Sequence, residues 1–167
     1  MRSHAQLTPI GLIRSPFQEP AGTPIQPVYA AQAQGTVEVF SDYVDGLLDL
    51  NGFERIWLLY WLDRAPVPCL QLVPFRDDVR HGVFATRAPC RPNPIGLSCV
   101  RLLGIEHNVL TVGGMDVLDG TPLLDIKPYV PAFDAFPQSR AGWFEKGRSN
   151  RTRADDRFQA EAPDPRD

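Results

Sequence analysis

The sequence predicts a mainly β protein, built as a small β-barrel with one short helix and a flexible C-terminal tail. Its apolar residues fall in short segments that alternate or are rich in β-branched residues, as half-buried strands do. Seventeen prolines and 13 glycines mark frequent turns and leave little room for long helices, because proline breaks helix interiors. We therefore expect a barrel domain over residues 1–137, followed by a basic arm and a disordered tail over residues 138–167.

The first half of the chain supplies three expected strands and the helix. Leu7–Arg14 is a short apolar segment, and Gly35–Phe40 (GTVEVF) alternates with a period of two. A helix is expected near residues 42–50, because Ser41 is a good N-cap. Arg55–Leu62 (RIWLLYWL) is the most apolar run, too short to cross a membrane and typical of a central buried strand.

The second half adds four more strand candidates. These are Cys69–Val73, Leu97–Ile105, Val109–Val112 and Leu123–Ile126. His107 and Asn108 leave only a tight connection between two of them, which predicts a hairpin. Six or seven short strands with loop-rich connections favour a closed or nearly closed barrel.

The last segment differs in composition from the rest of the chain. Residues 138–167 have almost no apolar periodicity, and the sequence ends in the charged, proline-containing APDPRD. The first part, Arg140–Arg157, has six basic residues against three acidic ones. We expect an arm that lies outside the ligand cleft and offers charges to phosphates, followed by a disordered tail.

Charge and motif content exclude several common classes of function. The net charge is −3, so binding of a nucleic acid would need a local basic face. Neither the three cysteines nor the three histidines show ligand spacing, so we expect no disulfide framework and no metal. Without a signal-peptide or membrane-spanning run, a cytoplasmic protein is the default expectation. Signatures of dinucleotide-binding, phosphate-loop, zinc-protease and hydrolase folds are also absent.

Gly82–Ser98 (GVFATRAPCRPNPIGLS) is the first segment that could carry chemistry. Three prolines fix φ angles and remove N–H groups, so the segment is a stiff loop and neither a helix nor a central strand. It displays Arg87, Arg91 and Asn93 at fixed positions, which lowers the entropic cost of binding a ligand. On spacing alone, a packed crossover loop whose arginines pair with nearby carboxylates is the better explanation.

Gly113–Tyr129 (GGMDVLDGTPLLDIKPY) is the second such segment. Its glycine pair lets the backbone approach a ligand closely, because no Cβ intervenes. Asp116, Asp119 and Asp125 could accept hydrogen bonds from a ribose or an amine, or serve as a base. The structural alternative is that Asp119 caps a turn and Asp125 pairs with Lys127.

Together these segments resemble the signature blocks of a known family. GVFATRAPCRPNPIGLS and DVLDGTPLLDIKPY are similar to two blocks of the TsaA/TrmO family of S-adenosylmethionine-dependent tRNA methyltransferases. The start, IGLIRSPFQEPAGTPIQP, is similar to the N-terminal block of the family, and RIWLLYWL is similar to its aromatic strand. The resemblance runs in the family's order from about Leu7 to Phe133, which makes it far more specific than one short motif.

The resemblance implies a fold, a cofactor and partners. Family members have a small β-barrel domain, usually a homodimer, that binds S-adenosylmethionine in a cleft near the subunit boundary. The best-known members methylate N6 of N6-threonylcarbamoyladenosine on the 3′ side of the tRNA anticodon. By this resemblance, the cofactor-binding positions are Gln26, Pro27, Asp63, Arg87, Leu97, Gly113, Gly114, Met115 and Asp116.

Other signature positions are those that the resemblance assigns to substrate and catalysis. They are Arg14, Asn93, Asp119, Lys127 and Tyr129. A positioned base, for which Asp119 is the candidate, would help a carbamoylated N6 that still holds its proton. Arg91, Arg101 and the basic arm are candidates for phosphate contacts, which fix position without reading sequence.

Two alternatives stay open from the sequence. Longer bacterial members of the family carry a sizeable second domain after the barrel, and this chain ends in a short tail. The acceptor could therefore be another RNA or a small molecule, with the cofactor unchanged. A non-catalytic module that only binds the cofactor would also retain many of the signature residues.

Overall fold

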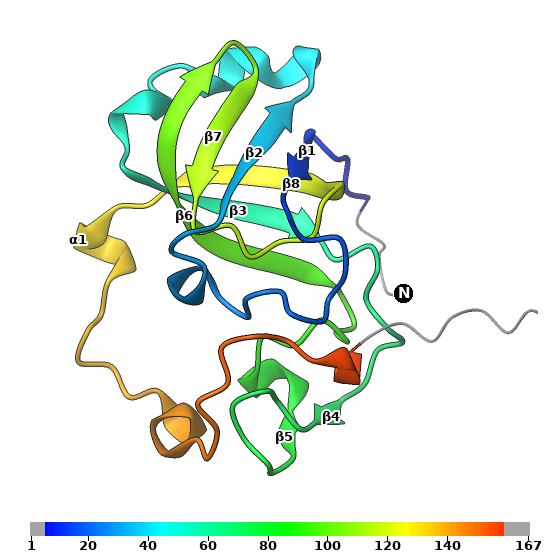
Figure 1. The fold of residues 1–167 in the computed structure, drawn as a ribbon. Helices are drawn as coiled ribbons and strands as arrows, with labels where there is room; N and C mark the ends of the chain where they lie inside the picture. Colours follow the sequence, from blue (N-terminus) through cyan, green and yellow to red (C-terminus); the bar gives the residue numbers. More distant parts are fainter. Residues whose placement is uncertain (1–5, 159–167) are drawn as a thin grey trace, which may run out of the picture.

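Six of the apolar segments pair as antiparallel strands and close into a barrel (Figure 1). The computed structural model describes residues 6–158. Around the barrel the strands are β1 (Gly11–Arg14), β2 (Gln34–Val39), β7 (Val109–Gly113), β6 (Ile95–Glu106), β3 (Arg55–Trp61) and β8 (Thr121–Pro128). Strand β8 pairs again with β1, which completes the ring. The mainly β barrel expected from the sequence is confirmed.

Alternation along the strands fills the barrel interior. On β3, Ile56, Leu58 and Tyr60 point inward, while the residues between them face outward. Because successive side chains of a strand point to opposite faces, the same pattern recurs around the ring. The other buried core residues include Ile13, Val37, Val39, Val100, Leu110, Val112, Met115 and Leu123. Each large aliphatic side chain that is fully buried stabilises the fold by about 1.5–3 kcal/mol.

The predicted hairpin joins β6 and β7. Glu106 pairs with Val109 across a turn formed by His107 and Asn108. His107 has a φ of 55°, in the left-handed region that few non-glycine residues adopt. Register shifts interrupt the β6–β7 pairing and the β3–β8 pairing. Such bulges increase the local twist, which helps a small sheet to close.

The helical segments are shorter and tighter than the sequence indicated. The helix expected near residues 42–50 is present as a 3₁₀ helix, Ser41–Leu47, followed by a 3₁₀ turn at Leu50–Gly52. Its N-cap is Phe40 rather than Ser41, and no side chain caps it. A segment this short gains too few hydrogen bonds to stabilise a regular α-helix. Other short helical segments are Pro27–Tyr29, Val83–Ala85, α1 (Pro131–Asp134), Gly142–Lys146 and Asp156–Phe158.

A second layer, made mostly of loops, lies below the barrel in Figure 1. We define the loop layer as residues 62–94 and 138–158. It contains β4 (Gln71–Leu72) and β5 (His81–Gly82), which pair with each other and not with the barrel. The strand expected over residues 69–73 is thus reduced to two residues, because a closed barrel leaves it no edge to join.

The basic arm is built into the loop layer. Trp143 Nε1 donates to the backbone oxygen of Ala85 at 2.7 Å, and its ring stacks on His81 with 4.5 Å between centroids. Phe158 packs against the small apolar cluster of the layer, which consists of Leu72, Val83, Ala88 and Cys90. The predicted disordered tail falls on residues 159–167, outside the described residues. The domain boundary at residue 137 stays a prediction.

Candidate functional site

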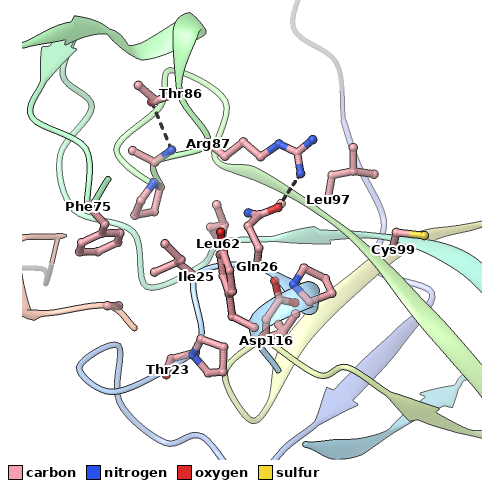
Figure 2. Close-up of a pocket in the computed structure, with 18 of the residues that line it drawn as sticks. Thr23, Ile25, Gln26, Leu62, Phe75, Thr86, Arg87, Leu97, Cys99 and Asp116 are labelled. Atoms are coloured by element: carbon pink, nitrogen blue, oxygen red, sulfur yellow. Dashed lines mark hydrogen bonds between the residues drawn. The ribbon is translucent and has the colours of Figure 1, made fainter. Parts of the chain in front are cut away.

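A large open cleft lies between the barrel and the loop layer. Its volume is about 1550 Å³, and its walls come from β3, β6, the proline-rich loop around residues 20–31, the Gly82–Ser98 loop and the arm. Figure 2 shows part of this lining. Eight of the nine predicted cofactor-binding positions line the cleft: Gln26, Pro27, Asp63, Arg87, Leu97, Gly113, Gly114 and Asp116.

Arg87 links two walls of the cleft. Its guanidinium donates to Oε1 of Gln26 at 2.6 Å, so the Gly82–Ser98 loop and the proline-rich loop meet at this point (Figure 2). Arg87 is exposed and Gln26 is half-buried, and both line the cleft. Their remaining N–H and oxygen groups are free to bind a polar ligand.

Arg91 stiffens the loop that presents Arg87. Its guanidinium donates to the backbone oxygens of Val83, Thr86 and Ala88, at 3.2, 2.8 and 3.4 Å. A charged donor shared among three carbonyls fixes a loop that lacks regular hydrogen bonding. All three contacts use Nη1, and Arg91 also lines the cleft, so the expectation that it contacts phosphates stays a prediction.

Asp116 ends a short polar chain that starts inside the barrel. Ser98 Oγ donates to Asp116 Oδ1 at 2.7 Å, and the Tyr60 hydroxyl lies 2.9 Å from the same Ser98 oxygen. Burial raises the pKa of Asp116 to about 7, although the Ser98 hydrogen bond and the charge of Arg87 act in the opposite direction. Burial, followed by the charge of Asp116, raises the pKa of Tyr60 well above its usual range. The cleft thus contains a carboxyl whose charge changes near neutral pH.

Sequence reasoning missed Ser98 and Tyr60, although a signal for Ser98 was present. It lies between Gly96 and Val100 on the inward face of β6, where an apolar residue is expected. Gly96 faces the Tyr60 ring across the β3–β6 pair, and any Cβ at this position would overlap that ring. Strand pairing and the missing Cβ therefore bring Tyr60 close enough to reach Ser98.

The segment after β7 reaches the cleft through its backbone. Gly114 has a φ of 84°, which favours glycine, and its N–H donates to the Ala33 oxygen at 2.9 Å. Met115 does not line the cleft; its side chain is fully buried in the barrel core. The predicted cofactor-binding role of Met115 is thus not supported by its side chain, because the chain turns here and directs that residue inward.

Asp119 lies outside the lining of the cleft. Its Oδ1 accepts a hydrogen bond from the backbone N–H of Ser15 at 3.0 Å, and its own N–H donates to the Phe17 oxygen at 2.7 Å. A short carboxylate next to a turn readily satisfies backbone donors in this way. The structure shows the capping contact that the sequence offered as the alternative, and the role of Asp119 as a base stays a prediction.

The other four predicted substrate positions are divided between the cleft and the outer surface. Tyr129 lines the cleft, next to Trp57. Arg14 and Asn93 are exposed and do not line it. Lys127 does not line it either, and its Nζ pairs with Oδ2 of Asp125 at 2.8 Å, as the structural alternative anticipated.

The arm forms part of the cleft wall. Trp143, Phe144 and Phe158 are among its lining residues, together with Arg76 of the loop layer. The guanidinium of Arg76 lies over the Phe144 ring at 5.1 Å from its centroid. The expectation that the arm lies outside the cleft is therefore wrong for its described part, because its aromatic side chains contact the loops that line the cleft.

Neither a metal cluster nor a membrane-spanning helix is present in residues 6–158. These residues contain no group of three or more His, Cys, Asp or Glu side chains placed to hold a metal ion. No helix in this part of the chain is both long and apolar enough to cross a membrane.

Fold and cleft define a small antiparallel barrel protein with a ligand site between the barrel and its loops. The chain belongs to the family described as the tRNA-methyltransferase O N-terminal domain, whose model matches residues 12–135. The matched range covers the barrel and both signature segments, so the family resemblance seen in the sequence is confirmed.

Individual relatives and solved structures are similar to most of the chain. A "probable S-adenosyl-L-methionine-binding protein" of Pyrococcus abyssi is 51% identical, over 90% of this chain and 83% of that protein. The tRNA (adenine(37)-N6)-methyltransferase of Escherichia coli is 34% identical over 84% of this chain, which spans 64% of that enzyme. The crystal structure of TrmO from Pseudomonas aeruginosa superposes with a TM-score of 0.71 at 43% identity, covering 84% of this chain and 62% of that one.

Proposed function

We propose that the chain is an S-adenosylmethionine-dependent methyltransferase that acts on N6 of threonylcarbamoyladenosine, on the 3′ side of the tRNA anticodon. The observation that carries the proposal is that eight of the nine positions predicted to bind the cofactor line one cleft, Asp116 and Arg87 among them. Family membership and the names of the relatives support it. The chain spans only 64% of the length of the Escherichia coli enzyme. The activity of that enzyme is therefore not transferred to this chain, and the proposal depends on the residues found in this chain.

The chemistry of the cleft fits this cofactor. S-adenosylmethionine would supply an electrophilic methyl group on a sulfonium, and it carries a second positive charge on its amino group. Asp63, Asp116, Asp134 and Asp155 line the cleft, and Asp116 is the one whose pKa burial raises to about 7, so a cation beside it would be attracted most strongly by its charged form. Arg87 and Gln26 offer donors and an acceptor for polar groups, and Leu97, 41% exposed, offers apolar surface. A cleft of about 1550 Å³ leaves space for an acceptor beside the cofactor.

The residues of the cleft can prepare a transfer in two ways. The loop that Arg91 stiffens holds Arg87 in place before a ligand arrives, which reduces the entropy lost on binding. Asp116 takes its charged form more readily when a cation is near, because an opposite charge lowers the pKa of a carboxyl. Binding of a cationic ligand near pH 7 would therefore release a proton from Asp116.

Calorimetry with S-adenosylmethionine tests the cofactor site. We expect the Arg87→Ala variant to bind at least tenfold more weakly than the wild type, because it loses a charged hydrogen bond that contributes about 1.5–3 kcal/mol. Arg80→Ala is the matched control, since Arg80 is an exposed arginine of the loop layer that does not line the cleft. A folded wild type that shows no binding, or equal weakening in both variants, would contradict the proposed site.

Methyl transfer itself is tested with tRNA that carries N6-threonylcarbamoyladenosine. After incubation with protein and cofactor, nucleoside mass spectrometry should show the mass of one added methyl group on this nucleoside. Cofactor binding without any change in the nucleoside would instead favour another acceptor or a non-catalytic binding module.

Assembly as a homodimer is also proposed from the family. At one end of the β3–β6 pair, Trp61 and Ile95 are opposite each other and are 45 and 42% exposed, which is the kind of apolar surface that a second copy can cover. Light scattering at micromolar concentration should give twice the chain mass of 18.6 kDa. A monomeric mass would contradict the dimer without affecting the cofactor site.

A further inference from the structure

We propose that Arg55, Arg101, Trp57 and Tyr129 form a subsite for single-stranded RNA on the outer face of the barrel, where the two arginines bind phosphate and the two rings stack on a base. All four residues line the cleft. The inference rests on the proposed function only in taking RNA as the acceptor.

Strand pairing sets the two arginines side by side. In the antiparallel β3–β6 pair, Arg55 is directly opposite Arg101, and both point to the outer face. Like charges in such a position destabilise a sheet unless something neutralises them. Within residues 6–158, no carboxylate lies within 4 Å of either guanidinium. A phosphate bound between them would supply the missing negative charge.

Two aromatic rings lie beside this pair. Trp57 is two residues along β3 from Arg55, and its ring centroid is 5.8 Å from that of Tyr129. Trp57 Nε1 donates to Asp134 Oδ2 at 3.4 Å, and the same oxygen accepts the Val130 N–H at 2.7 Å, so α1 holds the indole in place. Fixed, half-buried rings next to cationic side chains are what proteins use to bind single-stranded nucleic acid without sequence preference.

Lys127 adds a further cation on the same face. It is opposite Trp57 in the β3–β8 pair, and 62% of its side chain is exposed. Asp125 partly neutralises it, so Lys127 contributes less than the arginine pair. Its position still gives this signature residue a place near RNA, although it does not line the cleft.

Four of the five arginines of the arm, in contrast, are already used within the protein. Arg148 pairs with Asp78 at 3.0 Å, and Arg151 and Arg157 pair with Asp155. Arg153 donates to the backbone oxygen of Gly22 at 2.9 Å. Phosphate binding by these four arginines would have to break these interactions, whereas Arg55 and Arg101 have no ion pair to break among the described residues. The barrel face is therefore the better phosphate site.

Salt dependence of RNA binding tests the subsite. The probe is a fluorescein-labelled RNA with the sequence of a tRNA anticodon stem–loop, titrated with full-length protein at several salt concentrations. In the double variant Arg55→Gln/Arg101→Gln, we expect the log–log slope to decrease by about 0.7 to 0.9 for each phosphate that the arginines no longer neutralise. Arg140→Gln/Lys146→Gln is the matched control, because it removes two exposed charges from the arm. Its slope should stay close to that of the wild type.

Stacking is tested separately by substitutions of Trp57. Trp57→Ala should weaken RNA binding about fivefold or more, since one base–aromatic stack contributes about 1–3 kcal/mol. Trp57→Phe, which keeps a ring, should retain most of the affinity. Thermal melting checks the fold of each variant, and the double arginine variant should melt no lower than the wild type because it removes a like-charge pair.

The outcomes separate this inference from the proposed function. If the wild type binds the RNA and the double arginine variant keeps the same slope, or if the slope of the arm control falls as much, the subsite is wrong and the proposed function stands. If the wild type binds S-adenosylmethionine but does not bind RNA at any salt concentration, both the subsite and the RNA acceptor are wrong. Affinity for S-adenosylmethionine should stay within about twofold of the wild type in the double variant.

Discussion

The barrel and the loop layer face the same cleft but are held together by different interactions. The barrel has six strands in a closed hydrogen-bonded ring around an aliphatic core. The loop layer has one two-residue ladder and a core cluster of four small or medium-sized side chains. It depends instead on side chains that donate to backbone oxygens, among them Arg91, Trp143 and Arg157.

The barrel and the loop layer contribute different kinds of residues to the cleft, because different interactions hold the two regions together. Groups that must stay fixed and buried, such as Ser98 and Tyr60, belong to barrel strands. Arg87 and the aromatic residues of the arm belong to the loop layer, where backbone hydrogen bonds are isolated ones between loops and do not form a continuous ladder. Regions with few buried apolar contacts open at lower free energy than a core does. We therefore expect the barrel wall of the cleft to be rigid and the loop wall to adjust to ligands.

The largest expected effect is the loss of barrel stability in Leu58→Ala. Leu58 is fully buried in the barrel core, and such a truncation costs about 2–5 kcal/mol of unfolding free energy. Urea denaturation measures it, with Leu48→Ala as control because Leu48 is 81% exposed. Equal losses in the two variants would show that the barrel core is not what stabilises the protein.

A smaller effect is expected at the boundary between the two regions, in Asp116→Asn. The folded protein raises the pKa of Asp116 from 3.8 to about 7, so it binds this proton more tightly than the unfolded chain does. The unfolding free energy should therefore fall as pH rises from about 4 to 7, and the asparagine variant should lack this part of the dependence. At pH 8 the variant should be more stable by on the order of 3 kcal/mol.

Urea denaturation at pH 4, 6 and 8 measures this difference. Parallel stability profiles of wild type and variant would mean that Asp116 has an ordinary pKa.

The same variant should bind S-adenosylmethionine more weakly, because asparagine offers no charge to a cation. In the wild type, the affinity should increase as pH rises through about 7, as the carboxyl loses its proton.

The smallest expected effect is in the loop layer, in Trp143→Phe. Phenylalanine keeps a ring against His81 but loses the hydrogen bond to the Ala85 oxygen, which contributes about 1 kcal/mol. Hydrogen exchange should become faster at the amides of residues 83–88 and stay unchanged in the barrel strands. Faster exchange throughout the barrel would mean that the two regions unfold together and that the loop wall does not adjust independently.

Much of the barrel could be predicted from local sequence. Alternation and β-branched residues marked β2, β3, β6 and β7, since a strand with one buried face requires this pattern. The prolines of the Gly82–Ser98 segment predicted neither a helix nor a central strand, which is wrong at both ends: Val83–Ala85 forms a 3₁₀ helix, and barrel strand β6 begins at Ile95, directly after the last proline. The arm was misplaced relative to the cleft because its packing depends on single aromatic side chains that meet distant loops, and these contacts leave no periodic signal.

By itself, the sequence determined the barrel class and the hairpin at His107 and Asn108, because these follow from local patterning and turn chemistry. The segments that line the cleft were indicated only by the family resemblance. Only the tertiary structure decided which of two nearby aspartates serves the cleft. Asp116 is desolvated beside Ser98, while Asp119 is used to cap the backbone of Ser15. It also decided that Arg55 is opposite Arg101, because the register of β3 on β6 is set by the whole closed ring rather than by either strand.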